Sequence, residues 1–357
     1  MKQRILYLDV IRVMACVMIV LMHSPMPVQG DASVVMRLYL VYNGYITMPF
    51  LCLFFAVSGA LLLPTHIQPD QSGDWVKMRL KKVIAPTLFW TVVYLVVKWQ
   101  EGMQVKDLIQ SICSVPFSAQ GHGVLWFMYT LIGLYIIAPV ISPWLEKCGE
   151  KTLRLYLGLW AITLCYPILS KFVGVNTSDT GILYYLTGYV GYFVLGYYLR
   201  NYGDKIKTWW TVVLFVVALP LPGIAKVLGW DVDFYSVFWY LRVTALMMLL
   251  FWWKAGLAIA RWFESSLSRK FCQSEQSSSA NRLKSGVATL SNLSFGIYLS
   301  HILIMRTFLW PWLECFDNWW LQNVLSFGLT LVCATILSYI ISLLPFGDYV
   351  IGYKRRK

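Results

Sequence analysis

Charged residues are scarce in this sequence. Only 13% of its 357 residues are charged, whereas 58% are hydrophobic and the mean hydropathy is +0.61. Soluble domains carry about 25% charged residues, so the composition excludes an ordinary soluble protein and is typical of a helical membrane protein with several spans. The 17 Trp and 22 Tyr agree with that class, because aromatic rings collect at the two membrane interfaces.

Signatures of metal and redox sites are missing too. The eight cysteines include no CxxC pair, so the sequence predicts neither a zinc site nor a redox motif, and we expect no bound metal. Cys113 and Cys315 fall in loops on the same expected side, but nothing fixes their distance, which leaves a disulfide as a minor alternative. No internal repeat of fixed period is present, and this weakens, without excluding, a transporter built from inverted repeats.

Long apolar runs are what the sequence has instead. Segments of about 17 to 25 apolar residues mark membrane helices, and we predict ten of them. Their bounds are 5–23, 45–63, 83–99, 124–143, 152–170, 182–200, 208–227, 236–259, 287–309 and 321–344. We therefore expect an all-α, polytopic membrane bundle that forms a single domain over 1–357, with a flexible, serine-rich cytoplasmic loop at about 261–286.

The polar connectors alternate in charge. Lys and Arg number 22 on one side of the predicted bundle and six on the other, while two more lie inside spans. Cytoplasmic loops carry the excess of Lys and Arg, so we expect both termini in the cytoplasm. Topology thereby explains most of the net charge of +13, and nucleic acid is a poor alternative as a partner.

The first predicted span carries three ionisable side chains. Arg12 and His23 are eleven residues apart, which leaves them about 20° apart around a helix and about 16 Å apart along it. Asp9 precedes Arg12 by three residues, close enough to pair with it. All three project from one face, which must point into the protein or a wet cavity, since a lone Arg near the bilayer centre costs about 2.5 kcal/mol or more.

Two interpretations of this helix compete. In the first, Asp9 and Arg12 form a structural pair and His23 sits at the outer interface. In the second, the three residues line a polar track through the membrane and His23 is an acid or base, a task that suits the near-neutral pKa of an imidazole. We favour the second, because ionisable groups inside membranes are functional by default.

A polar stripe runs along another span, "LSNLSFGIYLSHIL". Ser291, Ser294, Tyr298 and His301 recur at spacings of three, four and three residues, which places them on one helix face. The serines can simply bond back to their own backbone. Tyr298 and His301 are stronger candidates to orient substrate or to complete a proton path, because a buried phenol and imidazole both need partners.

Two further spans contain candidate residues. Gly59 in "FFAVSGALLL" is expected to allow close helix packing, and Ser58 beside it is a candidate nucleophile or substrate contact without the GxSxG context. Arg242 is a second cation inside a predicted span, with Asp231 and Asp233 towards the outer end.

Five motifs in order resemble the membrane-bound acyltransferase family 3, which includes the O-acetyltransferases of bacterial surface polysaccharides. The first two are Arg12-x10-His23 and "FFAVSG". The others are "RLKKVIAPTLFWTVVY", "LWFMYTLIGLYIIAPVI" and "SFGIYLSHI", and together they cover nearly the whole chain. The chain is most similar to the short members, which lack an extra periplasmic domain.

The resemblance implies an acyl-CoA co-substrate, first of all acetyl-CoA, and no bound cofactor. Arg79 and Lys82 occupy the positions of an Arg-x-x-Arg motif, and as cations at a helix start they suit the donor's phosphates. Lys82 departs from the motif, because lysine lacks the bidentate guanidinium. Trp126 is a further candidate donor contact, although an interface belt is the likelier role for the aromatic residues around it.

The resemblance also implies an acceptor hydroxyl on a cell-surface or lipid-linked glycan and a place in the bacterial inner membrane. His23 would remove the hydroxyl proton, Arg12 would steady the developing oxyanion, and Asp9 would hold Arg12. Direct transfer and an acyl-histidine intermediate both fit. The alternatives are a transferase of the same fold for succinyl or longer acyl groups and a transporter or flippase for a glycan or lipid; the sequence leaves the oligomeric state open.

Overall fold

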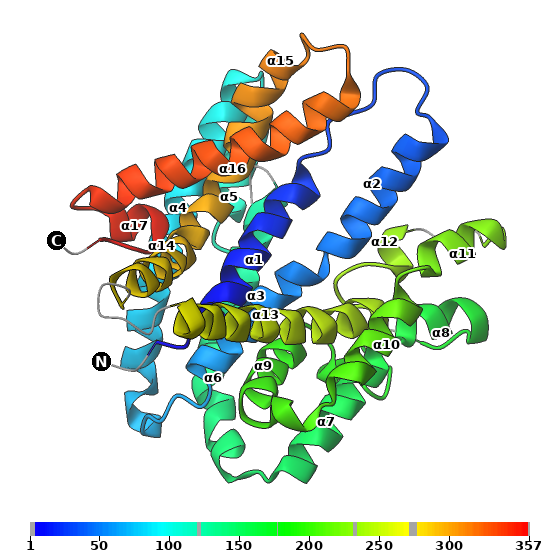
Figure 1. Ribbon diagram of the computed structural model, residues 1–357, viewed down its shortest axis with the longest axis vertical. Helices are drawn as coiled ribbons and strands as arrows, with labels where there is room; N and C mark the ends of the chain where they lie inside the picture. Colours follow the sequence, from blue (N-terminus) through cyan, green and yellow to red (C-terminus); the bar gives the residue numbers. More distant parts are fainter. Residues whose placement is uncertain (1–3, 120–122, 177, 231–233, 271–276, 356–357) are drawn as a thin grey trace. The chain divides into compact units, whose positions relative to one another are not determined.

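The computed structural model describes residues 4–119, 123–176, 178–230, 234–270 and 277–355. These residues form helices joined by turns and contain no strand (Figure 1). Nine helical segments within them are long and apolar enough to cross a membrane: Leu6–His23, Val34–Leu62, Ser72–Gln100, Gly123–Lys147, Glu150–Lys171, Thr208–Val227, Val243–Ser265, Arg282–Leu313 and Trp319–Leu343. The expected all-α, polytopic fold class is confirmed.

The predicted span 182–200 is wrong as a full-length membrane helix. The helix in this region, α9, runs only from Val190 to Tyr202 and has 13 residues. Gly188, two residues before it, has a φ of +97°, which a right-handed helix cannot contain. A helix of this size is about 20 Å long, whereas the hydrocarbon core is about 30 Å thick. Hydropathy alone did not reveal this interruption.

Helix α13 (Val243–Lys270) begins later than the predicted span 236–259. It also continues into the predicted loop 261–286, and the next helix, α14 (Ser277–Ile302), begins inside that loop. The loop is therefore helical at both ends, and its centre, 271–276, lies outside the described residues.

Helix α2 (Val34–Thr47) occupies much of the segment 24–44, which lies between the predicted spans 5–23 and 45–63 and was therefore expected to be an outer loop. Ser33 caps it through its side chain, which accepts a hydrogen bond from the backbone N–H of Met36. Helix α3 (Pro49–Leu62) follows after Met48, so the two form one apolar helical segment of 29 residues. The prediction placed only its second half in the membrane.

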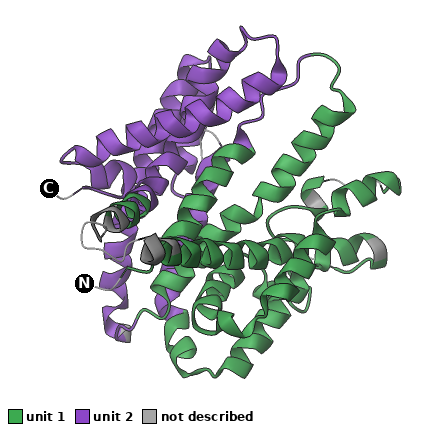
Figure 2. Ribbon diagram, viewed as in Figure 1, with its two compact units in different colours: residues 1–22, 30–65, 141–288 green, residues 23–29, 66–140, 289–357 purple. Residues whose placement is uncertain are grey.

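The chain divides into two compact units (Figure 2). Unit 1 comprises Met1–Met22, Gly30–Thr65 and Ile141–Ala288, and unit 2 comprises His23–Gln29, His66–Val140 and Thr289–Lys357. Each unit thus combines segments that are far apart in the sequence.

The closest helix packing in unit 1 joins α3 to α9. A Cβ atom at Gly59 would lie 1.7 Å from the carbonyl oxygen of Phe193, and one at Gly196 would lie 1.7 Å from the carbonyl oxygen of Ala56. Both distances are far below a van der Waals contact, so only glycine fits at either position. The predicted packing role of Gly59 is confirmed, and Gly196 is its counterpart.

Tyrosine hydroxyls satisfy backbone carbonyls inside unit 1. Tyr45 donates a 2.7 Å hydrogen bond to the carbonyl of Ala218, and Tyr192 donates one of 2.8 Å to the carbonyl of Tyr240. Both rings are fully buried. These carbonyls lie at or near helix ends, where the helix itself supplies no donor.

Unit 2 uses the same device on α4 (Ser72–Gln100), whose partners lie on α14 and on α17 (Gly347–Ile351), the short helix that follows α16 (Trp319–Leu343). The Trp90 indole donates to the carbonyl of Val350 at 3.0 Å, and the Tyr94 hydroxyl donates to the carbonyl of Leu299 at 2.7 Å. Long-range bonds of this kind tie the C-terminal helices to α4 at defined heights.

We predict that Gly196→Ala lowers the stability of the detergent-solubilised protein. The added methyl group would overlap the carbonyl of Ala56, and overpacking of this kind costs about 1–3 kcal/mol. The measurement is the thermal midpoint by fluorescence. Gly158→Ala in α7 (Glu150–Thr163) is the matched control, because no atom lies within 4 Å of its added methyl group. Equal midpoints for the two variants would contradict the tight contact.

Candidate active site

Two of the predicted residues, His23 and His301, meet in unit 2. Their ring centroids are 5.4 Å apart and the ring planes are inclined by 39°. His23 is the last residue of α1 (Leu6–His23) and is half-buried, whereas His301 lies near the end of α14 and is fully buried. Residues separated by 278 positions thus bring two imidazoles together.

The hydrogen bond of His301 determines which of its nitrogens is available. Nδ1 lies 2.5 Å from the backbone carbonyl oxygen of Tyr298. A carbonyl only accepts hydrogen bonds, so Nδ1 must carry the hydrogen, and in a neutral ring the lone pair is then on Nε2. Nε2 is buried and has no hydrogen-bond partner among the described residues.

Tyr298 is held by the start of the neighbouring helix. Its hydroxyl donates a 2.5 Å hydrogen bond to the carbonyl of Val124, in the short 3-10 helix Gly123–Leu125, and its ring lies 5.1 Å from that of Phe127. The predicted stripe is therefore a buried face, because Ser291, Ser294 and Tyr298 are all buried with His301. Ser294 bonds back to the carbonyl of Ser291, which is the structural alternative for the serines.

A π-helix, Leu303–Leu309, begins two residues after His301. Such segments are rare and occur often at functional sites, because they interrupt the regular hydrogen bonding of a helix. Arg306 within it is exposed, and its guanidinium carbon lies 5.4 Å from the centre of the Trp310 ring.

The chain that leaves His23 is clamped at Met26. The backbone N–H of Met26 donates to Oδ1 of Asn323 at 2.8 Å, and the indole of Trp319 donates to the Met26 carbonyl at 3.1 Å. Asn323 and Trp319 lie in the first turns of α16 and are both buried. Both backbone groups of Met26 are thereby paired, which fixes the segment that positions the His23 ring.

Asp9 and Arg12 lie on α1 within unit 1. The Asp9 side chain is 10% exposed and accepts two hydrogen bonds from Arg4, at 2.5 and 3.1 Å. Arg4 also donates to the carbonyl of Ala288 at 2.7 Å. Arg12 is half-buried, as expected for a cation turned away from lipid. Sequence spacing offered Arg12 as the partner of Asp9, and the structure adds Arg4.

The other two predicted path residues also belong to unit 1. Ser58 is half-buried in α3, next to the glycine that contacts α9. Arg242 is half-buried and lies one residue before α13, so it is outside this helix although the predicted span 236–259 contains it. Its guanidinium donates to the carbonyl of Leu241 at 2.8 Å. Asp231 and Asp233 lie outside the described residues.

The predicted donor contacts lie in unit 2. Arg79 is half-buried in α4, with its guanidinium carbon 5.5 Å from the centre of the Trp75 ring and its Nε atom buried without a partner. Lys82, one turn later, is exposed. Trp126, half-buried, is the first residue of α6 (Trp126–Lys147). Arg79 is thus a partly buried cation with a free donor.

No group of His, Cys, Asp and Glu residues suited to a metal ion occurs in the described part of the chain. Cys113 and Cys315 are free and exposed, so the minor alternative of a disulfide between them is wrong. His66 is exposed, and His122 lies outside the described residues.

Sequence reasoning missed the residues that hold the histidines and Asp9 in place. A signal was present for Asn323, a polar residue in an otherwise apolar helix, and for Arg4, a cation one turn before Asp9. The role of the Val124 carbonyl had no signal, because backbone groups are the same at every position.

Comparison with known proteins gives one family. A family model described as an acyltransferase domain matches residues 5–343 of the chain. No curated protein and no solved structure matches it. The matched range includes both histidines and all the residues that contact them.

We predict that nitrogen NMR of the histidine-labelled protein finds the Nδ1–H tautomer at His301. The Tyr298 carbonyl requires a donor at Nδ1, and Nε2 then gives the signal of an unprotonated ring nitrogen. The chain has only four histidines, so the His301→Gln variant assigns the signal by its loss. An Nε2–H tautomer at this residue would contradict the geometry.

Proposed function

Because the chain belongs to acyltransferase family 3, a family of membrane proteins, we propose that it transfers an acyl group from cytoplasmic acyl-CoA to a glycan. The acyl group is acetyl, and the acceptor is a hydroxyl of a cell-surface or lipid-linked saccharide. The observation that carries this proposal is the pair of imidazoles at His23 and His301, one of which has a buried nitrogen with a free lone pair.

The reaction needs a base and a stabilised oxyanion. The acceptor oxygen forms a bond with the thioester carbonyl carbon while its proton passes to the His23 ring. The carbon–sulfur bond then breaks, and the departing thiolate takes a proton, which His23 returns. A base placed in this way contributes about 10²–10⁴-fold to the rate, because sugar hydroxyls are weak nucleophiles.

His301 supports His23 in this scheme. Its Nε2 lone pair is free to accept a proton or a hydrogen bond, and the Tyr298 carbonyl keeps the ring in that state. Two adjacent imidazoles can pass a proton between them, which gives the proton a route away from the reacting oxygen. Tyr298 acts as a positioning residue through its carbonyl.

Arg12 is the proposed donor to the oxyanion, and Asp9 is proposed to hold Arg12 in place. A guanidinium aimed at the developing negative charge stabilises the transition state more than the ground state. Two hydrogen bonds from Arg4 fix the position of the Asp9 carboxylate. Ser58 and Arg242 are proposed contacts on the path of the substrates.

Arg79, Lys82 and Trp126 are the proposed contacts of the donor. The guanidinium of Arg79 lies against the Trp75 ring, and its unpaired Nε offers a charge-assisted hydrogen bond to an oxygen of the donor. We place the protein in a bacterial inner membrane with its termini in the cytoplasm, the compartment that holds acyl-CoA, and membrane lipids surround the bundle.

We predict that His23→Ala lowers kcat at least about 100-fold, because the acceptor hydroxyl loses its base. The measurement is formation of acylated glycan by purified protein with acetyl-CoA, read by mass spectrometry. His66→Ala, in an exposed segment, is the matched control and should keep wild-type activity. Near wild-type turnover by His23→Ala would contradict His23 as the base and favour His301 in that role. If the wild-type protein formed no acylated product, a transporter would be favoured.

We predict that Arg79→Ala raises the KM for acetyl-CoA about tenfold and leaves kcat nearly unchanged. Loss of one charge-assisted hydrogen bond costs about 1.5 kcal/mol, and about 1.4 kcal/mol is a factor of ten. Lys81→Ala, an exposed neighbour outside the motif, is the control. Equal KM values for both variants would contradict donor binding by Arg79. The basic residues around it would then only reflect the usual excess of Lys and Arg on the cytoplasmic side. The mass added to the product separates acetyl from succinyl and longer groups.

A further inference from the structure

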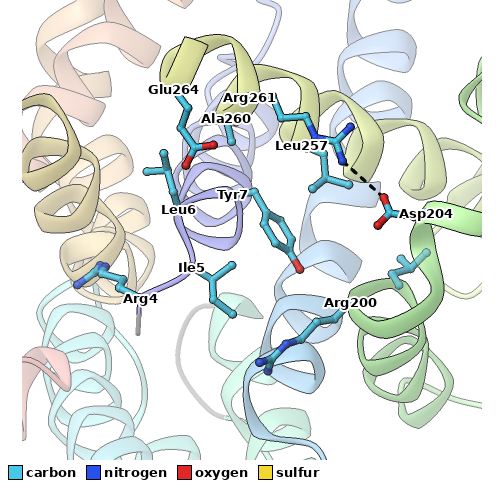
Figure 3. Close-up of a pocket in the computed structure, with 11 residues that line it drawn as sticks. Arg4, Ile5, Leu6, Tyr7, Arg200, Asp204, Leu257, Ala260, Arg261 and Glu264 are labelled. Atoms are coloured by element: carbon cyan, nitrogen blue, oxygen red, sulfur yellow. Dashed lines mark ion pairs between the residues drawn. The ribbon is translucent and has the colours of Figure 1, made fainter. Parts of the chain in front are cut away.

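Unit 1 contains a pocket of about 400 Å³ at the beginning of α1 (Figure 3). The segments that line it come from three parts of the sequence: residues 4–7, the end of α9 with the turn after it, and α13. Small-molecule sites have volumes of about 300–1,000 Å³, so the pocket is large enough for a ligand bigger than an inorganic ion.

Three arginines line the pocket, and they differ in how strongly they are already bound. Arg4 makes three hydrogen bonds, two to Asp9 and one to the Ala288 carbonyl. Arg200, by contrast, makes one hydrogen bond among the described residues, from Nη1 to the Ala60 carbonyl at 2.6 Å. That bond satisfies a carbonyl in the last turn of α3 and leaves the other guanidinium donors available.

Arg261 is the third arginine, and its partner is weak. Its Nη2 atom lies 3.5 Å from Oδ1 of Asp204, and the two side chains are 71% and 90% exposed. Exposed pairs of this length are screened by water and contribute little, so a phosphate can replace the carboxylate. Lys254 adds a fourth cation nearby through its 2.8 Å bond to the Gly203 carbonyl.

We propose that this pocket binds the adenosine-phosphate end of the acyl donor, with Arg200 and Arg261 on phosphate oxygens and Tyr7 against the base. The assignment rests on the proposed function only for the identity of the donor. The phosphate preference rests on the arginines of the lining, because guanidinium groups recognise phosphate through paired N–H donors.

The rest of the lining favours a nucleotide over a lipid phosphate. The half-buried Tyr7 ring is held edge-on by Trp253, at 6.1 Å and 70°, and offers a fixed flat surface for a base. Asp204 and Glu264 also line the pocket, and carboxylates accept hydrogen bonds from ribose hydroxyls and from an exocyclic amino group. Diacyl lipid phosphates have no base that would use such acceptors.

The predicted topology places this pocket on the side where acyl-CoA is found. It opens beside Arg4, next to the N-terminus, and the segments 200–207 and 254–284 both belong to the basic, predicted cytoplasmic side. A nucleotide cannot enter hydrocarbon, so its site has to be at a water-facing end of the helices. The pocket meets that requirement.

The test uses adenosine 3′,5′-bisphosphate, which carries the phosphates and the base but no thiol or acyl group. Its Kd for the full-length protein in detergent is measured by calorimetry for the wild type, Arg261→Gln and Tyr7→Leu. We expect both variants to bind it at least tenfold more weakly. Plain adenosine should lose affinity only in Tyr7→Leu, because Arg261 contacts phosphate.

Arg154→Gln is the matched control. It breaks another arginine–carboxylate pair of unit 1, to Glu150 at 2.5 Å, and Arg154 does not line the pocket. Wild-type Kd values for Arg261→Gln and Tyr7→Leu would overturn the assignment, and so would a loss of affinity of the same size in Arg154→Gln. Arg261 is exposed, so its variant leaves the packing intact and a folding defect does not obscure the result.

Two further experiments distinguish a nucleotide from a lipid phosphate and distinguish the pocket assignment from the proposed function. Native mass spectrometry with phosphatidylglycerol tests the lipid: variants that lose the lipid but keep the nucleotide would overturn the assignment. Acyl transfer is assayed separately. If the wild type transfers the acyl group but the variants bind the nucleotide with an unchanged Kd, the pocket assignment is wrong and the proposed function stands. If the variants bind the nucleotide more weakly but the wild type shows no transfer, the pocket assignment is supported and the proposed function is wrong.

Discussion

The absence of water around a membrane helix is the constraint on which this structure depends. Every polar group at that depth must find its partner within the protein, because an unsatisfied one costs several kcal/mol. The chain meets the constraint with side chains that donate to backbone carbonyls of distant helices, as Tyr45, Tyr94, Tyr192 and Tyr298 do. Each such bond fixes the height of one helix against another. Several buried side-chain atoms of the described residues lack a partner, and Nε2 of His301 is the imidazole nitrogen among them.

The sequence predicted the helical membrane class and most span positions, because each of these depends on a strong local pattern. It also singled out His23 and His301, which lie together in unit 2. Composition identified the membrane environment, and spacing placed His23 and His301 on the correct faces of their helices. It failed where a single residue interrupts an apolar run. Gly188, with its positive φ, shortens α9, while the hydropathy of 182–200 is that of an ordinary span. It failed also at α2, which begins in a stretch that contains Asp31, Ser33 and Arg37 and is therefore similar to a loop.

Partners distant in sequence could not be predicted from one chain. Spacing suggested Arg12 for Asp9, because residues three apart are neighbours on a helix, yet Arg4 supplies two of the hydrogen bonds from the extended residues before α1. The clamp on Met26 by Asn323 and Trp319 joins residues almost 300 positions apart. Only the folded backbone brings such groups together. The sequence thus showed which residues of the first helix are charged. The segments before and after the helix, which hold Asp9 and position His23, became visible only in the structure.

The irregular turn after His301 explains why the polar stripe ends there. Ser291, Ser294, Tyr298 and His301 follow the α-helical period, but in the π-helix Leu303–Leu309 the hydrogen bonds span one more residue, so the following side chains shift to other faces. Regular periodicity therefore carries no information beyond His301. Two departures from ordinary helix chemistry, the unpaired nitrogen and the π-helix, coincide within nine residues. Departures of this kind weaken a helix and persist where they serve a site. For this reason His301 has as strong a structural claim to the chemistry as His23, although the motif in the first helix drew attention to His23 first.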